Sequence, residues 1–292
     1  SPAPGTITAT NVPVTLGGQC TQLASITATG PGAALNLQGL TLKDTTLPVI
    51  GGDPGRAWTI ADTNVFWDNV TRPASETILT GANWLTFRNN LTLTPGSTLS
   101  LDTTSASTRA IQSLLGSTQS ILGTGTIRSL TGTHAMHVGG TLTIASGITL
   151  ASGQPTRLDI TGGNVPASDR SLVVLGTLRA TGGATMDVTP VVNNQGSLIA
   201  NGGTINLLSP PANFNPATGA LVGGRWEMRS STPSGSHGLI SLYQQGVAPV
   251  RRIAANTTVI IDGSSSGLLG FDPASSIFYG SIFGLESLSG TL

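Results

Sequence analysis

The stretch from Gly176 to Leu207 reads GTLRATGGATMDVTPVVNNQGSLIANGGTINL, and its pattern decides the fold class. It contains three copies of one unit, in which a glycine is followed by threonine or serine and then by an alternating run that begins with an apolar residue. Alternation with a period of two predicts short strands with one buried face. The glycines, asparagines and prolines between the copies predict turns, so this stretch indicates a succession of short strands.

The same unit recurs upstream, with copies that begin at Gly96, Gly125 and Gly140. Most starts follow one another at a quasi-regular interval, and the longest interval, from Gly140 to Gly176, fits two units. Residues 105–115 are the best helical candidate and would make two or three turns at most. A doubly wound α/β fold is therefore excluded, because a crossover helix must separate its parallel strands.

Two all-β architectures stay open on the pattern alone, an antiparallel sandwich or barrel and a parallel β-helix. Asn201-Gly202-Gly203 and Gly162-Gly163-Asn164 have the composition of tight hairpin turns, which favours the first. Copies of one short strand type at a quasi-regular interval favour the second. We predict a parallel β-helix (β-solenoid) of roughly 12–14 rungs, with about 20 to 24 residues per rung and inward aliphatic side chains stacked about 4.8 Å apart.

The composition supports an all-β fold and excludes several functions. Charged residues make up 9% of the 292 residues, against roughly 25% in an average soluble domain. Lys43 is the single lysine, and residues that favour helices are scarce. The 13 basic and 13 acidic residues cancel, so nothing indicates nucleic-acid binding by neutralisation of phosphates. No apolar run approaches the roughly 20 residues of a membrane-spanning segment.

Residues 191–207, VVNNQGSLIANGGTINL, resemble the rungs of large secreted bacterial β-helix proteins. These include filamentous-haemagglutinin-like adhesins and autotransporter passenger domains. Residues 212–227, 254–263 and 285–292 resemble a longer repeat of very large bacterial surface proteins. The resemblance covers the last hundred residues well and residues 90–190 loosely. It implies a β-helix that is exported from a bacterium and has a structural or adhesive role.

The first part of the chain departs from the repeat pattern. Three of the four tryptophans and four aspartates lie between residues 40 and 90. A solenoid needs its terminal rung covered, because an open strand edge recruits other chains. We therefore predict an N-terminal cap or accessory β region at residues 1–89 and β-helix repeats at residues 90–292. The strand-like residues Thr6 to Thr10 are the candidate for a strand that is added to another copy.

Carboxylates that could act in catalysis are sparse. Polysaccharide lyases and hydrolases need paired carboxylates, or carboxylate-bound calcium with a basic residue that abstracts a proton. The nearest candidates are Asp62 and Asp68, with Arg56, Arg72 and Arg88 around them. Because no Asp-x-Asp, Asp-Asp or Glu-x-Glu cluster occurs, we predict no catalytic residue, no cofactor and no enzymatic activity.

A few further side chains carry possible chemistry. His134 and His137 would point to opposite faces of a strand, so we predict no metal site. Cys20, the single cysteine, is interpreted as a small buried apolar residue, with an intermolecular disulfide as the alternative. Trp58 and Trp67 are the candidates for stacking on the rings of a glycan. The favoured alternative for both tryptophans is that they fill the core of the cap.

Together these features predict a non-enzymatic, extracellular rod module of a bacterial surface or secreted protein with a structural and adhesive role. The expected partners are a host or matrix glycan or protein. Two alternatives stay open. One is a self-assembling fibre subunit that binds further copies of itself head to tail. The other is a carbohydrate-active, lyase- or hydrolase-type, or carbohydrate-binding β-helix protein.

Overall fold

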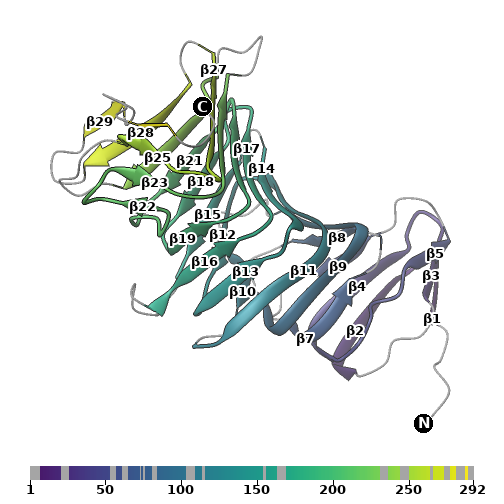
Figure 1. Ribbon diagram of the computed structural model, residues 1–292. Helices are drawn as coiled ribbons and strands as arrows, with labels where there is room; N and C mark the ends of the chain where they lie inside the picture. Colours follow the sequence, from purple (N-terminus) through teal and green to yellow (C-terminus); the bar gives the residue numbers. More distant parts are fainter. Residues whose placement is uncertain are drawn as a thin grey trace.

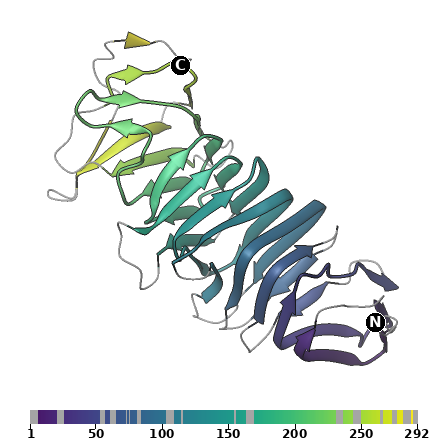
Figure 2. The ribbon, with the colours of Figure 1, turned by 60° about the horizontal axis from the view of Figure 1, so that its bottom comes forward.

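The computed structural model describes residues 7–20, 26–52, 57–60, 65–72, 74, 76–80, 84–102, 109–113, 116–153, 156–162, 169–230, 236–243, 250–263, 266–272, 277–280 and 287–288. Regular structure in these residues consists of β-strands, and no α-helix occurs among them. The predicted all-β class is therefore confirmed. The strands are stacked in one direction, from the N-terminal strands at one end to the C-terminal strands at the other (Figure 2).

Most strands belong to three ladders of parallel strands (Figure 1). Ladder 1 contains β2 (Pro13–Cys20), β4 (Ala34–Lys43), β7 (Val65–Arg72), β9 (Leu85–Asp102), β10 (Arg109–Ser113), β12 (Thr133–His137), β15 (Arg157–Thr161), β18 (Thr185–Val188), β21 (Thr204–Leu207), β25 (Leu239–Tyr243) and β28 (Gly267–Asp272). Ladder 2 contains parts of β7 and β9, followed by β11 (Thr118–Thr131), β13 (Thr141–Ile144), β16 (Ser171–Val174) and β19 (Val191–Asn194).

Ladder 3 contains parts of β2, β4, β9 and β11 together with β6 (Trp58–Ile60), β8 (Glu76–Leu79), β14 (Gly147–Ser152), β17 (Thr177–Thr181), β20 (Ser197–Asn201), β24 (Arg225–Arg229) and β27 (Thr258–Asp262). The remaining strands are β1 (Ile7–Thr10), β3 (Ile26–Thr29), β5 (Ile50–Gly52), β22 (Phe214–Asn215), β23 (Ala220–Leu221), β26 (Arg252–Ile253), β29 (Ile277–Gly280) and β30 (Ser287–Leu288). Because several long strands belong to two ladders, the ladders join into one closed network.

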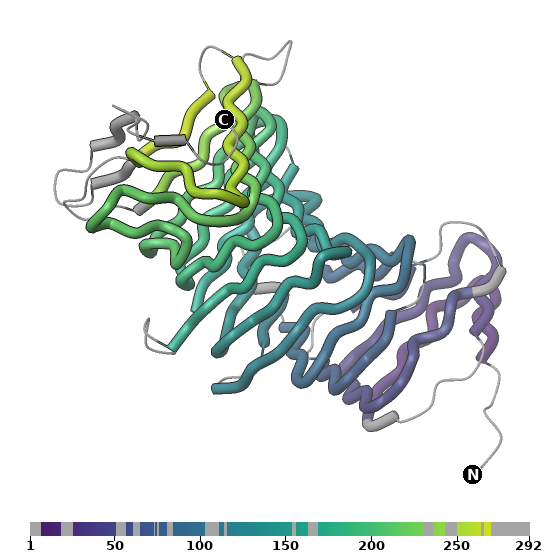
Figure 3. Tube along the Cα trace, viewed as in Figure 1, coloured from purple at the N-terminus to yellow at the C-terminus, as the bar shows by residue number. Residues whose placement is uncertain are grey.

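The chain visits ladders 1, 2 and 3 in turn through the middle of the protein, as strands β15 to β20 show in order (Figure 3). Each return to a ladder places the new strand beside the previous one. In ladder 3 the step from Thr177 to its partner Ser197 is shorter than the next two steps, to Arg225 and to Thr258. Within the described residues, ladder 3 contains eleven levels, and the number of rungs predicted from the sequence stays a prediction.

The core consists of side chains that alternate along each strand and line up from level to level. In ladder 3, Leu150, Leu178, Leu198, Trp226 and Val259 are successive register partners, and each is 0% exposed. Burial of a large apolar side chain is worth about 1.5–3 kcal/mol, so columns of this kind contribute strongly to stability. The predicted inward alternation of apolar residues is present in these strands.

Left-handed residues form the corners at which the chain leaves one ladder for the next. Asp44, Asn69 and Asn89 have φ angles of 47°, 54° and 60°, a conformation that Asn and Asp adopt more readily than most residues. Asn69 Nδ2 donates to Asp44 Oδ1 over 3.0 Å, which ties neighbouring corners together. Gly123 has a φ of 86°, and a Cβ there would lie 2.0 Å from the carbonyl oxygen of Leu93, so only glycine fits.

Outward side chains also bond from level to level. Ser171 Oγ donates to Thr141 Oγ1 over 3.0 Å. Asp159 and Asp187 are register partners, which places two like charges opposite each other. The guanidinium of Arg157 compensates their repulsion, since its nitrogens lie 2.6 Å from Asp159 Oδ1 and 2.5 Å from Asp187 Oδ2.

Two local alternatives that the sequence offered are not observed. The helical candidate at residues 105–115 contains strand β10, whose Ile111 is buried and pairs with β9 and β12. The backbone hydrogen bonds of β10 to β9 and β12 outweigh the weak helical spacing of the apolar residues in this segment. Asn201-Gly202-Gly203, whose composition also suits a hairpin, is a corner, because β20 and β21 each pair with strands of other levels. The other hairpin-like sequence, residues 162–164, lies mostly outside the described residues.

The predicted boundary between residues 89 and 90 falls inside β9. This strand pairs with β7 on one side and with β11 on the other, so ladder 2 continues across the boundary. The expected added strand at Thr6–Thr10 contains β1, which pairs in parallel with β3 of the same chain. A cap function for residues 1–89 stays a prediction.

Candidate functional site

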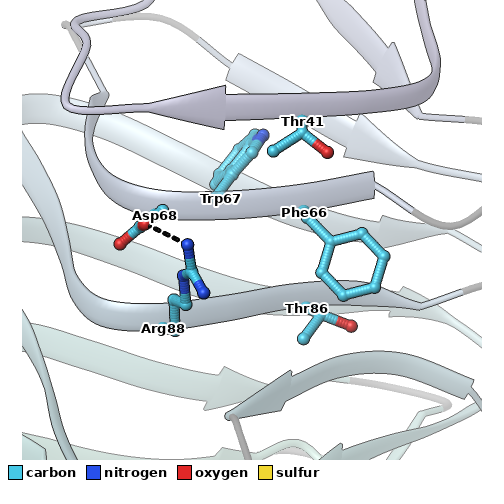
Figure 4. Close-up of a pocket in the computed structure, with 6 residues that line it drawn as sticks. All are labelled: Thr41, Phe66, Trp67, Asp68, Thr86 and Arg88. Carbon is cyan, nitrogen blue, oxygen red and sulfur yellow. Dashed lines mark ion pairs between the residues drawn. The ribbon is translucent and has the colours of Figure 1, made fainter. Parts of the chain in front are cut away.

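The outer face of ladder 1 carries an exposed aromatic side chain in its first levels. Phe66 on β7 is the register partner of Thr41 on β4 and of Thr86 on β9. Its ring stands between these two short side chains and is 47% exposed (Figure 4). Val65 and Trp67, its neighbours along the strand, point into the core, as the period of two requires.

A surface hollow of about 270 Å³ lies at this ring. Its walls are formed by Thr41, Phe66, Trp67, Asp68, Thr86 and Arg88 (Figure 4). The lining combines an aromatic face with hydroxyl groups and one ion pair. Sites for small ligands typically have this composition, a largely apolar surface with a few polar groups that set orientation.

An ion pair beside Phe66 holds a cation at the edge of the hollow. Two residues along the strand from Phe66, Asp68 pairs in register with Lys43 and Arg88. Arg88 Nη2 lies 2.6 Å from Asp68 Oδ2, and Asn89 Nδ2 donates to Asp68 Oδ1. Asp68 is only 4% exposed, whereas the side chain of Arg88 is 53% exposed. The carboxylate is therefore covered and its partner cation faces solvent.

The electrostatics of Asp68 suit a fixed anion. Burial raises its pKa, but hydrogen bonds from Arg88 and Asn89 and the positive charges of Arg88 and Lys43 outweigh that effect, so the pKa of Asp68 lies below its ordinary value. Both carboxylate oxygens already accept a hydrogen bond. Asp68 is thus a positioning group for Arg88 and a poor general acid.

The same face continues with polar and aromatic side chains. Gln112 on β10 donates through Nε2 to Thr86 Oγ1 over 2.6 Å, and its register partner on β12 is His137. The ring of His137 packs against Trp84, with centroids 4.2 Å apart and planes tilted by 52°. Aromatic and amide groups therefore follow Phe66 along ladder 1.

The two tryptophans predicted to stack on glycans lie in the core. Trp58 is 0% exposed and donates through Nε1 to the carbonyl oxygen of Pro48 over 3.2 Å. Trp67 is 1% exposed, and the guanidinium of Arg72 lies 5.9 Å from its ring centroid. Neither ring face is open to a sugar, which corrects the glycan-stacking hypothesis for both residues. The favoured alternative, a role in the core, fits their burial.

Three of the charged candidates for catalysis lie in the described part of the chain. Asp68 and Arg88 form the ion pair described above. Arg72 is 0% exposed, and burial lowers its pKa to about 9. Asp62 and Arg56 lie outside the described residues.

The histidines and the cysteine complete the predicted chemistry. His134 is buried, with Nε2 at hydrogen-bond distance from the carbonyl oxygen of Thr131, whereas His137 is half-exposed. Burial lowers the pKa of His134, and that contact and the charge of Asp102 only partly oppose the shift. The side chain of Cys20 lies outside the described part of the chain. Within the described residues, no three His, Cys, Asp or Glu side chains are grouped to hold a metal.

Sequence reasoning missed Phe66, although a signal was present. In Val65-Phe66-Trp67-Asp68, a period of two with Trp67 inward places Phe66 and Asp68 outward. The partners of Phe66 could not be read from the sequence, because Thr41 and Thr86 lie on other strands, far from it along the chain.

Comparisons with known proteins identify no family for this chain. No family model, no curated protein and no solved structure matches this chain. The described residues contain no helix with the length and apolar character that crossing a bilayer requires.

Proposed function

We propose that the chain is a parallel β-helix and serves as a non-enzymatic structural and adhesive rod module. The observation that carries this proposal is the in-register pairing of ladders 1 and 3 over eleven levels each, with apolar columns facing inward. A stack of this kind keeps its shape without cofactors and presents side chains at fixed intervals of about 4.8 Å.

The adhesive role is supported by the outer face of ladder 1. The hollow at Phe66 is open to solvent and contains groups suited to binding. The pKa values of Asp68, Glu76 and Glu227 lie below their ordinary values because hydrogen bonds and arginine charges outweigh burial. Carboxylates held ionised in this way are poor general acids.

The location and the partners rest on the sequence. The resemblance of residues 191–207 to rungs of secreted bacterial proteins supports export from a bacterium to the surface or the medium. A matrix or host glycan or protein is the partner expected for such a module.

Spin labels on one column of ladder 3 test the fold. Thr98, Thr126, Thr177 and Thr258 belong to the same outward column, which runs through Thr149, Ser197 and Arg225. In a Cys20→Ser background, doubly labelled Thr98/Thr258 and Thr126/Thr258 variants are expected to give distances of about 29 and 24 Å, since six and five levels separate them. A Thr126/Thr258 distance that is not shorter than the Thr98/Thr258 distance by about one level spacing, about 4.8 Å, would contradict a β-helix.

Binding and turnover measured on the same samples test the function. Beads coated with the chain are expected to be retained on glycan- or matrix-coated surfaces, and the polysaccharide is expected to be recovered uncleaved. New reducing ends or unsaturated products that disappear in an Asp68→Asn variant would replace the adhesive proposal with an enzymatic one. Absence of retention on every surface would reject adhesion while leaving the fold result intact.

A fibre subunit is the second candidate, favoured by one observation. Among the described strands, β2 pairs only with β4, so no described strand pairs with the other edge of this eight-residue strand, and such an edge can bind another chain. Light scattering against concentration separates the candidates, because only a fibre subunit elongates as concentration rises.

A further inference from the structure

We propose that the hollow at Phe66 binds a uronic acid residue of an anionic polysaccharide, with the sugar ring on Phe66 and its carboxylate on Arg88. This inference rests on the proposed adhesive function and names its ligand class. The site is defined by Phe66, Thr41, Thr86 and Arg88.

The aromatic half of the site is a platform for one face of a sugar ring. Phe66 is one of the few large hydrophobic side chains that are exposed in the described residues, at 47%. Thr41 and Thr86 flank it; Thr86 is 3% exposed, and its hydroxyl oxygen accepts a 2.6 Å hydrogen bond from Gln112. An apolar face bordered by polar groups matches a pyranose, which has apolar C–H faces and polar edges.

The cationic half of the site is a pre-positioned guanidinium. Asp68 holds Arg88 through the 2.6 Å contact to Nη2, and Asn89 in turn holds Asp68. A guanidinium has five N–H donors in a rigid fork, and its geometry suits a carboxylate. Since the Arg88 side chain is 53% exposed, part of this fork can reach a ligand without breaking the ion pair.

The spacing of the two halves fits one sugar residue. Thr86 is the register partner of Phe66, and Arg88 lies two positions further along β9. With strands about 4.8 Å apart and a rise of about 3.3 Å per residue, such diagonal neighbours are about 8 Å apart, a span that a pyranose ring with a carboxylate on C5 can bridge. The volume of about 270 Å³ is at the lower limit for ligand pockets and accommodates a single residue of a longer chain.

Charge favours an acidic sugar over a neutral one. Lys43 and Arg88, the cations in this column, are exposed, whereas the carboxylate between them, Asp68, is buried. Asp44, an exposed carboxylate, follows Lys43 at the corner and accepts a hydrogen bond from Asn69. The surface next to Phe66 therefore presents positive charge, which complements a uronate.

Calorimetric titration with a short oligogalacturonate and with the neutral galactose oligomer of equal length tests the assignment. The wild-type chain is expected to bind the acidic oligomer at least tenfold more tightly, with an affinity that falls as salt rises. Phe66→Ala and Arg88→Gln are each expected to weaken binding at least tenfold. Arg128→Gln is the matched control, since Arg128 also pairs with a carboxylate, Glu76, and the Arg128 side chain is 45% exposed. The affinity of this variant for the acidic oligomer is expected to differ less than twofold from that of the wild-type chain.

Each other outcome overturns a defined part of the inference. Equal affinity for the acidic and neutral oligomers would reject recognition of the carboxylate. Binding that survives both site variants, or that Arg128→Gln weakens as much, would reject this site. Failure of the wild-type chain to bind either oligomer would reject the ligand class, while retention of coated beads on other surfaces would leave the adhesive function standing. Circular dichroism of each variant verifies folding, which is expected because both side chains are exposed.

Discussion

Replacement of Leu178 by alanine tests whether the inward column of ladder 3 carries the stability. Leu178 is 0% exposed and lies between its register partners Leu150 and Leu198, which are also fully buried. The next residue, Arg179, lies on the opposite face of the same strand and is exposed. The two positions therefore differ in facing direction while sharing strand and level.

The expected cost follows from the atoms that are removed. Leu178→Ala deletes three carbon atoms, worth about 2.4 kcal/mol at about 0.8 kcal/mol per buried methylene. Hydrogen bonds of the ladder fix the backbone on both sides, so the cavity cannot collapse fully, and a cavity contribution raises the total to about 3–4 kcal/mol. Arg179→Ala is expected to change the free energy of unfolding by less than about 0.5 kcal/mol.

Urea unfolding followed by circular dichroism measures both variants, with the midpoint and the slope fitted separately. A shift of one residue in register would exchange the inward and outward faces of β17. Equal costs for the two substitutions, or a larger cost for Arg179→Ala, would therefore refute the assignment of faces. A changed slope would indicate that part of the stack unfolds separately.

Three further predictions concern buried polar groups. Arg72→Met is expected to raise the free energy of unfolding, measured in urea, by an amount on the order of 1–3 kcal/mol, because burial of the guanidinium opposes its charge; a lower value would show that its contacts outweigh desolvation. Asn213→Leu is expected to cost about 3 kcal/mol in the same assay, because the Asn213 amide accepts one backbone hydrogen bond and donates two at a buried corner; a neutral effect would contradict this role. In the folded chain, the pKa values of Asp68, Glu76 and Glu227 are lowered despite burial. The unfolded chain therefore binds more protons in acid, and urea unfolding midpoints are expected to fall as the pH drops below about 4 towards these lowered pKa values. Midpoints that stay constant from pH 7 to pH 3 would contradict the ion pairs.

The regular strands were predictable because their signal is local. In Thr177–Thr181 and Ser197–Asn201, each residue's facing direction follows from the period of two, and burial agrees with it. The strand at Arg109–Ser113 was not predictable, because its helical spacing was outweighed by pairing with strands far away in the sequence. Phe66 was hidden for another reason, since Trp67 beside it has the larger ring for glycan stacking, yet that ring is buried.

By itself the sequence determined the strand class and the alternation of faces, since both depend on neighbours within a few residues. Only the tertiary structure decided which strands pair, how many levels form and which side chains meet, because long and unequal stretches of chain separate the paired strands. The juxtaposition of Phe66 with the Asp68–Arg88 pair is of this second kind. It exists because parallel pairing of β7 with β9 places side chains that are distant in the sequence next to each other on one outer face.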